Sequence, residues 1–251
     1  MNIVACIKRV PDSSARIKIS ADGKSIDPAG VEFVLNPYDE FAVEEALRLK
    51  EKAGTGEIAV IALGGPESAE TLRNKVLAMG ADRAVLLKES TAGRDPIATA
   101  QALAAEIKSR PADVVFFGIK AIDDDGAQVA ALTATLLGWP CVAGVTKLEW
   151  NGRKVTAHRP VEGGTEIVDL ELPAVFSAQK GLNDPRFPNI KGIMAAKKKP
   201  LEEKPALPGE PRLQLLSLEN PPSRPAPRIV GQGKDAVPAL VKLLREEARV
   251  I

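Results

Sequence analysis

The chain has 251 residues, of which 45% are hydrophobic and 27% are charged, and its formal net charge at pH 7 is +1. This near-neutral charge gives no electrostatic case for binding nucleic acid or an anionic membrane, and no apolar run reaches the roughly 18–20 residues of a membrane span. With two cysteines and one histidine in the sequence, a zinc centre or a Cys/His catalytic site is disfavoured.

Apolar runs alternate with helical patterns over the first 140 residues. The apolar runs are residues 2–8, 57–64, 81–88 and 112–118. The helical segments between and after them are residues 36–54, 64–80, 94–110 and 127–138. Near-continuous apolar runs are typical of parallel strands that are buried on both faces. The alternation therefore predicts a doubly wound, mostly parallel α/β sheet of the Rossmann-like, adenine-nucleotide-binding kind.

The pattern changes after residue 140. Residues 145–172 predict a small antiparallel excursion of short strands, with turns at Asn151-Gly152 and Gly163-Gly164. Residues 172–178, LPAVFSA, then predict a return to a buried strand.

The C-terminal part of the sequence predicts an extended arm that ends in a helix. Residues 200–233 are rich in proline and charge, as in a linker. Residues 235–250 have the amphipathic pattern of a helix. We therefore predict an α/β domain over residues 1–199 and a C-terminal arm and helix over residues 200–251, which is expected to dock on a partner subunit.

Ligands of an open parallel sheet bind beyond the carboxyl ends of its strands, where the strand order reverses. Three loops fit that description: residues 35–40, 63–66 and 118–131. In the first loop, Asn36 is expected to cap a helix that has Pro37 in its first position. The glycines of LGGP at 63–66 allow close approach of a phosphate, although glycines also make ordinary tight turns.

The third loop carries three successive aspartates just before a helix. Carboxylates at this place can bind ribose hydroxyls, while backbone amides near Gly126 to Gln128 bind phosphate. The simpler alternative is that one aspartate caps the helix. The sequence has neither a GxGxxG fingerprint nor a P-loop, which disfavours a standard dinucleotide fold and a P-loop NTPase.

Four segments in this order resemble the beta subunit of electron transfer flavoprotein: VLNPYDEFAVEEALRLKE, AMGADRAVLL, AIDDD and LPAVFSAQKGLNDPRFPNIKGIMAAKKK. The resemblance covers nearly the whole chain. It implies a heterodimer in which the alpha subunit holds the redox-active FAD and the beta subunit buries an AMP with a structural role. It also implies acyl-CoA-type dehydrogenases as electron donors and electron transfer flavoprotein–quinone oxidoreductase as acceptor, with no catalytic acid, base or nucleophile in this chain.

The resemblance assigns residues to two sites. The positions implied to contact AMP are Cys6, Asn36, Pro37, Tyr38, Asp39, Gly64, Gly65, Ile119, Lys120, Ala121, Ile122, Asp123, Asp124, Asp125, Gly126, Ala127, Gln128, Val129 and Ala130. A recognition loop at about residues 178–199 is implied to present Leu182 as the anchor for dehydrogenases. Its neighbours in the same interface are Gly181, Asn183, Pro185 and Arg186. The simpler alternative is that Leu182 packs against its own domain as an ordinary loop residue.

Two other functions stay open. A subgroup of this family binds a second FAD in place of AMP and performs electron bifurcation, with a loop that often reads AIDGD–AQVGP. The present loop, AIDDDGAQVAA, shares features with both forms, and Asp124 at the glycine position favours AMP. The other function is that of an α/β enzyme that activates its substrate with ATP; against it, LGGPES at 63–68 only partly matches an SGGxDS-type pyrophosphate loop.

The first ten residues, MNIVACIKRV, lack the pattern of a secretory signal and indicate a first strand. A bacterial cytoplasm and a mitochondrial matrix both fit the composition. Without a presequence pattern, the cytoplasm is the preferred expectation.

Overall fold

The computed structural model of the protein describes residues 1–89, 94–209, 211–223 and 226–251. The chain forms two units, Met1–Leu218 and Glu219–Ile251. The first unit therefore extends beyond the predicted boundary between residues 199 and 200.

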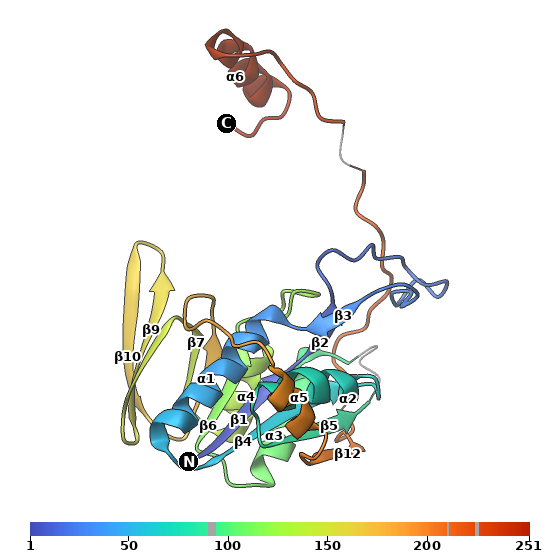
Figure 1. Ribbon diagram of the computed structural model, residues 1–251. Helices are drawn as coiled ribbons and strands as arrows, with labels where there is room; N and C mark the ends of the chain where they lie inside the picture. The colour runs from blue at the N-terminus through green and yellow to red at the C-terminus, as the bar shows by residue number, and fades with distance from the viewer. Residues whose placement is uncertain (90–93, 210, 224–225) are drawn as a thin grey trace. The chain divides into compact units, whose positions relative to one another are not determined.

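The first unit is built on a seven-stranded sheet in which every pair of neighbouring strands is parallel (Figure 1). In spatial order the strands are β12 (Leu201–Pro205), β5 (Arg83–Lys88), β4 (Glu57–Gly64), β1 (Asn2–Ile7), β6 (Val114–Gly118), β11 (Ala174–Ala178) and β7 (Cys141–Val145). From β1 the chain proceeds to β4 and β5 on one side and then crosses back to β6 on the other. The strand order thus reverses between β1 and β6, and the predicted doubly wound α/β fold is confirmed.

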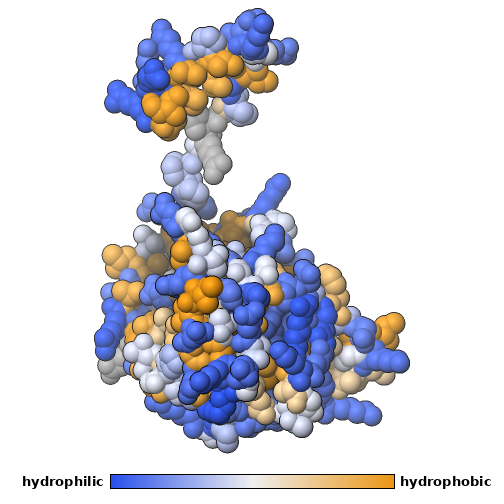
Figure 2. Space-filling model, turned by 90° about the vertical axis from the view of Figure 1, so that its left-hand side faces the viewer, coloured by the Kyte–Doolittle hydropathy of each residue, from blue (hydrophilic) through white to orange (hydrophobic). Residues whose placement is uncertain are grey.

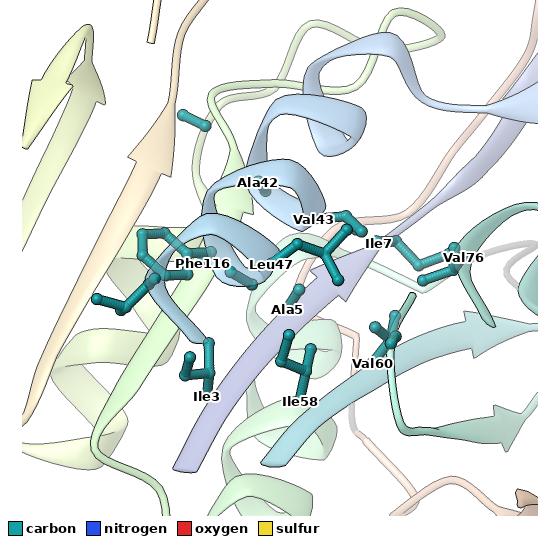
Figure 3. Packing of buried hydrophobic residues seen from close by; sticks show 14 of the residues in the cluster. Ile3, Ala5, Ile7, Ala42, Val43, Leu47, Ile58, Val60, Val76 and Phe116 are labelled. Atoms are coloured by element: carbon teal, nitrogen blue, oxygen red, sulfur yellow. The ribbon is translucent and has the colours of Figure 1, made fainter. Parts of the chain in front are cut away.

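Helices cover both faces of this sheet. One face carries α1 (Pro37–Ala53), α2 (Ser68–Thr71) and the π-helical segment η1 (Leu72–Leu77), and the other carries α3 (Pro96–Lys108) and α4 (Val129–Leu137). Figure 3 shows the first layer, where Val43 and Leu47 of α1 lie over Ile3 and Ala5 of β1. Because successive strand side chains point to opposite faces, a strand covered on both sides needs an unbroken apolar run, and NIVACI provides one.

The antiparallel excursion forms a separate three-stranded sheet, as predicted. Its strands are β8 (Lys147–Asn151), β9 (Lys154–Val161) and β10 (Gly164–Glu171), in the order β10-β9-β8. Trp150 on β8 packs edge-on against Phe116 and Phe176 of the main sheet, with ring centroids 6.3 and 5.9 Å apart. This aromatic contact joins the two sheets. A short ribbon of β2 (Arg9–Pro11) and β3 (Phe33–Leu35) follows β1.

The charged segment LEEKP, predicted to belong to the arm, forms the edge strand β12 beside β5. An edge strand tolerates polar side chains because one of its sides is not covered by another strand. The ammonium group of Lys204 also lies 2.5 Å from the carboxylate of Glu106, a side chain only 5% exposed on α3. Beyond β12, the carboxylate of Asp95 accepts the backbone N–H groups of Arg212 (2.6 Å) and Leu213 (3.2 Å), which keeps this stretch within the first unit.

The second unit contains the short helix η2 (Lys234–Ala236) and α6 (Val237–Glu246), so the predicted C-terminal helix is present. Apolar side chains gather along one side of α6 (Figure 2), and Val237 and Leu240 are 53% and 43% exposed. An amphipathic helix usually buries its apolar face against another part of a protein. The exposed apolar face of α6 can therefore pack against another protein surface. None of the helices in the described ranges has the length and apolar character needed to cross a membrane.

Candidate functional site

A pocket of about 320 Å³ lies at the reversal point of the sheet, beyond the carboxyl ends of β1, β4 and β6. Its volume is in the range of small-ligand sites. The lining residues are Cys6, Ile7, Lys8, Asn36, Asp39, Leu63, Arg94, Pro96, Thr99, Leu103, Phe117, Gly118, Ile119, Lys120, Ala121, Asp123, Asp124, Gly126, Ala127, Gln128, Val129 and Ala130. The loops at 35–40 and 118–131, far apart in the sequence, therefore meet at one cavity.

Several predicted residues lie beside this pocket and do not line it. They are Pro37, Tyr38, Gly64, Gly65, Ile122 and Asp125. An added Cβ at either glycine would meet only side-chain atoms: Ser68 Oγ, 2.6 Å away, at Gly64 and the carboxylate of Glu67 at Gly65. The LGGP turn thus contributes Leu63, rather than its glycines, to the pocket wall.

Two lining residues, Leu63 and Gly118, begin the predicted loops 63–66 and 118–131 without being among the predicted contacts. Seven others lie outside every predicted loop and contact: Ile7, Lys8, Arg94, Pro96, Thr99, Leu103 and Phe117. Lys8 and Gly118 carry a recognisable signal, because each stands where an apolar strand ends at the edge that binds ligands. The α3 residues carry none in the sequence, since only the packing of α3 against α4 brings them to the cavity.

Asn36 has a different role from the predicted helix cap. Its side chain makes no capping hydrogen bond to α1. Instead, Nδ2 donates to the carbonyl of Lys120 (2.9 Å), and Oδ1 accepts the N–H of Ile122 (3.3 Å). The side chain is buried, so both of its polar ends need partners. Asn36 therefore fastens the pocket loop to the start of α1.

Asp39 joins the ends of two strands beneath the pocket. Its carboxylate accepts the backbone N–H of Lys8 (2.7 Å), which follows β1, and that of Gly118 (3.0 Å), which ends β6. Burial raises the pKa of Asp39 to about 7, although these two donors oppose the change. The group holds β1, β6 and the first turn of α1 in a fixed arrangement.

Lys8 and Lys120 form ion pairs with the three aspartates of the pocket loop. The ammonium group of Lys8 lies 2.8 Å from Asp123 and 3.1 Å from Asp124, and that of Lys120 lies 2.9 Å from Asp125. Burial disfavours the charged form of Lys8, but its hydrogen bond and attraction to Asp123 outweigh this and raise its pKa. The loop is therefore acidic in composition, but each of its three aspartates has a lysine partner in the folded chain.

The end of the loop has the backbone geometry of an anion site. Asp125 and Ala127 have positive φ angles of 51° and 52°, and Gln128 returns to φ −106°. Alternating left- and right-handed dihedrals turn successive N–H groups into one concavity. The helix α4 begins at Val129, and its first N–H groups have no acceptor within the helix. Amides and helix dipole together favour an anion here.

No set of three or more His, Cys, Asp or Glu side chains lies together as metal ligands in the described ranges. Both cysteines are free thiols, and burial raises the pKa of Cys6 and of Cys141. A raised pKa keeps a thiol protonated and unreactive. Cys6 thus contributes a pocket wall.

The predicted recognition loop is rooted on α1. Asn183 donates from Nδ2 to the carbonyl of Phe41 (3.0 Å) and to Glu45 (3.1 Å). The guanidinium of Arg186 makes two hydrogen bonds, 2.8 and 3.0 Å, to Glu44, and its backbone N–H makes a third, 3.1 Å; the side chain of Glu44 is only 3% exposed. Burial raises the pKa of Glu44, but the guanidinium groups of Arg186 and Arg48 outweigh it and lower the pKa. Bidentate pairing of this kind fixes the loop's orientation.

Leu182 is placed differently from the predicted exposed anchor. Its side chain is half-buried and packs against the hydrophobic core. The exposed apolar side chains come later in the loop and in α5 (Ile190–Ala196): Phe187 is 89% exposed, Ile190 80% and Met194 60%. Of the other predicted contact residues, Gly181 is exposed, whereas Asn183 is buried and Pro185 half-buried.

Comparison with known proteins agrees with this architecture. Residues 24–208 match the family described as electron transfer flavoprotein domain. Three similar proteins are each named electron transfer flavoprotein subunit beta. The protein from Bacillus subtilis is 41% identical to this chain, and the match covers 100% of both chains. The protein from Syntrophomonas wolfei is 42% identical, over 90% of this chain and 88% of the relative. The protein from Homo sapiens is 36% identical, over 100% of this chain and 99% of the relative. Since both the family match and these identities extend over most of the chain, it belongs to the electron transfer flavoprotein family, among the beta subunits.

Proposed function

We propose that this chain binds AMP as a structural component and pairs with an alpha subunit that holds the redox-active FAD. The heterodimer accepts electrons from acyl-CoA-type dehydrogenases and passes them to electron transfer flavoprotein–quinone oxidoreductase, and so to the respiratory chain. The observation that carries the proposal is the pocket at the reversal point of the sheet, in a chain of the electron transfer flavoprotein family. A bacterial cytoplasm is the proposed location, with the mitochondrial matrix as the alternative.

The residues of the pocket fit a nucleoside monophosphate. The N–H groups of Ala127 to Val129 would hold the phosphate, by the anion geometry described above. Asp123 and Asp124 offer carboxylate oxygens to ribose hydroxyls. The side chains of Leu63, Leu103 and Phe117 form an apolar wall of the kind that covers a base. AMP supplies no redox chemistry here; it fills the cavity between loops that otherwise face water.

This chain brings no catalytic acid, base or nucleophile to the proposed reaction. Its part is to support the flavin of the alpha subunit through the subunit interface and to present a surface to the dehydrogenase. The C-terminal arm and α6 serve the first task in this proposal, because α6 carries an apolar face with Val237 and Leu240 exposed.

The dehydrogenase-facing surface is formed by Phe187, Ile190 and Met194, on the loop that Arg186 and Asn183 hold against α1. Exposed apolar side chains on a pre-ordered loop bind a partner at low entropic cost, which is the property of interface hot spots. Leu182 helps to hold the same loop in place through its contact with the core.

Co-expression with an electron transfer flavoprotein alpha subunit tests the main proposal. We expect a yellow heterodimer that releases one FAD and one AMP on acid extraction, as quantified by chromatography. Two flavins and no AMP would instead identify the bifurcating type. A chain that stays monomeric beside the alpha subunit would contradict the whole assignment.

Two substitutions in the loop are expected to distinguish a residue that contacts the dehydrogenase from one that stabilises the fold. Ile190→Ala should slow reduction of the heterodimer's flavin by an acyl-CoA dehydrogenase about 10-fold, since a hot-spot truncation costs about 1.4 kcal/mol or more. It should change the free energy of unfolding by less than about 0.5 kcal/mol, because the side chain is 80% exposed. Leu182→Ala should lower that free energy by about 2 kcal/mol. Stopped-flow reduction and denaturant unfolding measure the two quantities.

Ile167 on β10 provides the matched control, since it is also an exposed isoleucine, at 60%. Ile167→Ala should leave both quantities unchanged. If Leu182→Ala slows electron delivery without loss of stability while Ile190→Ala does not, Leu182 is the anchor and the surface proposed here is wrong.

A further inference from the structure

The three cationic side chains that line the pocket have different ion-pair partners. Arg94 pairs with Glu89 and donates to the carbonyls of Ala98 (2.7 Å) and Leu207 (3.0 Å). Lys120 pairs with Asp125, which lies outside the lining. Lys8 is the cation that bridges both aspartates of the lining loop, Asp123 and Asp124.

Two carboxylates beside an anion site create an electrostatic conflict. Asp123 and Asp124 precede the N–H groups of Ala127 to Val129, and all of these residues line the pocket. Unpaired, the two negative charges would repel a phosphate group at these amides. Nucleotide sites with acidic residues commonly relieve such repulsion with Mg²⁺, which binds carboxylate and phosphate oxygens together. The ammonium group of Lys8 lies where such a cation would bind both carboxylates.

We propose that Lys8 is a positioning residue that takes the place of a divalent cation in the nucleotide pocket, so that AMP binds tightly without Mg²⁺. This inference rests on the proposed AMP function. Lys8 acts through Asp123 and Asp124, whose negative charge it partly offsets, and it leaves the backbone amides to hold the phosphate.

The backbone around Lys8 fits a fixed positioning role. Its N–H donates to Asp39 (2.7 Å), and its carbonyl accepts the N–H of Asn36 (3.0 Å). Both main-chain groups are thus tied to the start of α1, which fixes the backbone from which the side chain reaches Asp123 and Asp124. Asp124 also accepts the N–H of Gly126 through Oδ1 (3.0 Å). The bridge from Lys8 therefore reaches the turn that forms the anion site.

The test uses the heterodimer after removal of its nucleotide, with binding measured by calorimetry in EDTA and then in millimolar Mg²⁺. In EDTA, Lys8→Met should weaken AMP binding at least 10-fold, whereas binding of uncharged adenosine should change less than 3-fold. Mg²⁺ should restore AMP binding to Lys8→Met and leave the wild type unaffected. Lys8→Arg should keep most of the affinity, because it keeps the charge.

Two further variants define the controls. Asp123→Asn with Asp124→Asn should remove the effect of Lys8→Met on AMP, because no carboxylate then needs a counter-charge. Lys147→Met removes an equal charge from β8, where Lys147 pairs with Glu149 (2.7 Å), and should leave AMP binding unchanged.

The outcomes distinguish this inference from the function on which it rests. If Lys8→Met binds AMP as tightly as the wild type, or loses AMP and adenosine equally with no rescue by Mg²⁺, Lys8 has only a structural role and the inference is overturned. A wild-type heterodimer that binds neither AMP nor adenosine overturns the nucleotide pocket itself, and the role of Lys8 with it.

Discussion

Replacement of Gly118 by alanine is expected to lower the free energy of unfolding by about 3 kcal/mol and to weaken AMP binding at least ~10-fold. A Cβ at this position would lie 2.7 Å from the carbonyl carbon of Tyr38 and 2.8 Å from the backbone nitrogen of Asp39. These are main-chain atoms in the first turn of α1, so relief requires the helix to move away from β6. That movement would break the hydrogen bond from Gly118 to Asp39 (3.0 Å) at the base of the pocket.

Gly164 is the matched control for this substitution. It begins β10, and a Cβ there would meet no atom within 4 Å. Gly164→Ala should change stability by less than about 0.5 kcal/mol, as measured by urea unfolding, and should leave AMP binding unchanged. Equal behaviour of the two variants would mean that the close approach of β6 to α1 does not limit the fold or the pocket.

The buried carboxyl of Asp39 is expected to make stability fall as pH rises from about 4 to about 7. Its pKa is about 7 in the folded chain and 3.8 in the unfolded reference, so the folded state holds one more proton between these values. Stability decreases with pH wherever the folded state binds more protons. At 1.36 kcal/mol for each unit, the carboxyl removes about 3 kcal/mol of stability between pH 5 and pH 8. Above about pH 8, where Asp39 is ionised in both states, its contribution is constant.

Asp39→Asn isolates this contribution, because burial also raises the pKa values of Glu40 and Glu45 and these add to the wild-type profile. The measurement is the difference in unfolding free energy between pH 5 and pH 8, obtained with urea for both proteins. We expect the decrease to be about 3 kcal/mol larger in the wild type. Equal pH profiles would show that Asp39 ionises in the folded chain as easily as in the unfolded one.

The sequence predicts strands most clearly where both faces of the strand are buried. Strands such as β4 (Glu57–Gly64) and β6 (Val114–Gly118) are covered on both faces, so each needs a continuous apolar run, and that run is visible without a structure. The turns at Gly152 and Gly163 were equally visible, since both have positive φ angles, 61° and 79°, that favour glycine. These two signals suffice for the sheet, its antiparallel excursion and the approximate place of the pocket.

Elements at the edge of the fold were harder to predict. β12 reads LEEKP, which has the composition of a linker, and only its pairing with β5 makes it a strand. Leu182 and Ile190 are both loop or short-helix apolar residues in the sequence. Which of them packs inward depends on how Asn183 and Arg186 attach the loop to α1, and those contacts join residues about 140 positions apart.

The family resemblance, the doubly wound sheet and the loops that border the pocket were thus accessible from local pattern, because hydrophobic period and turn chemistry act over a few residues. The contacts that define the pocket were decided by tertiary structure. The side chain of Asn36 donates a hydrogen bond to the carbonyl of Lys120 and does not cap α1 as expected. Lys8 pairs with Asp123, which lies more than a hundred residues later in the sequence. Such pairs depend on which strand ends become neighbours, and only the crossing from β5 back to β6 places β1 beside that loop.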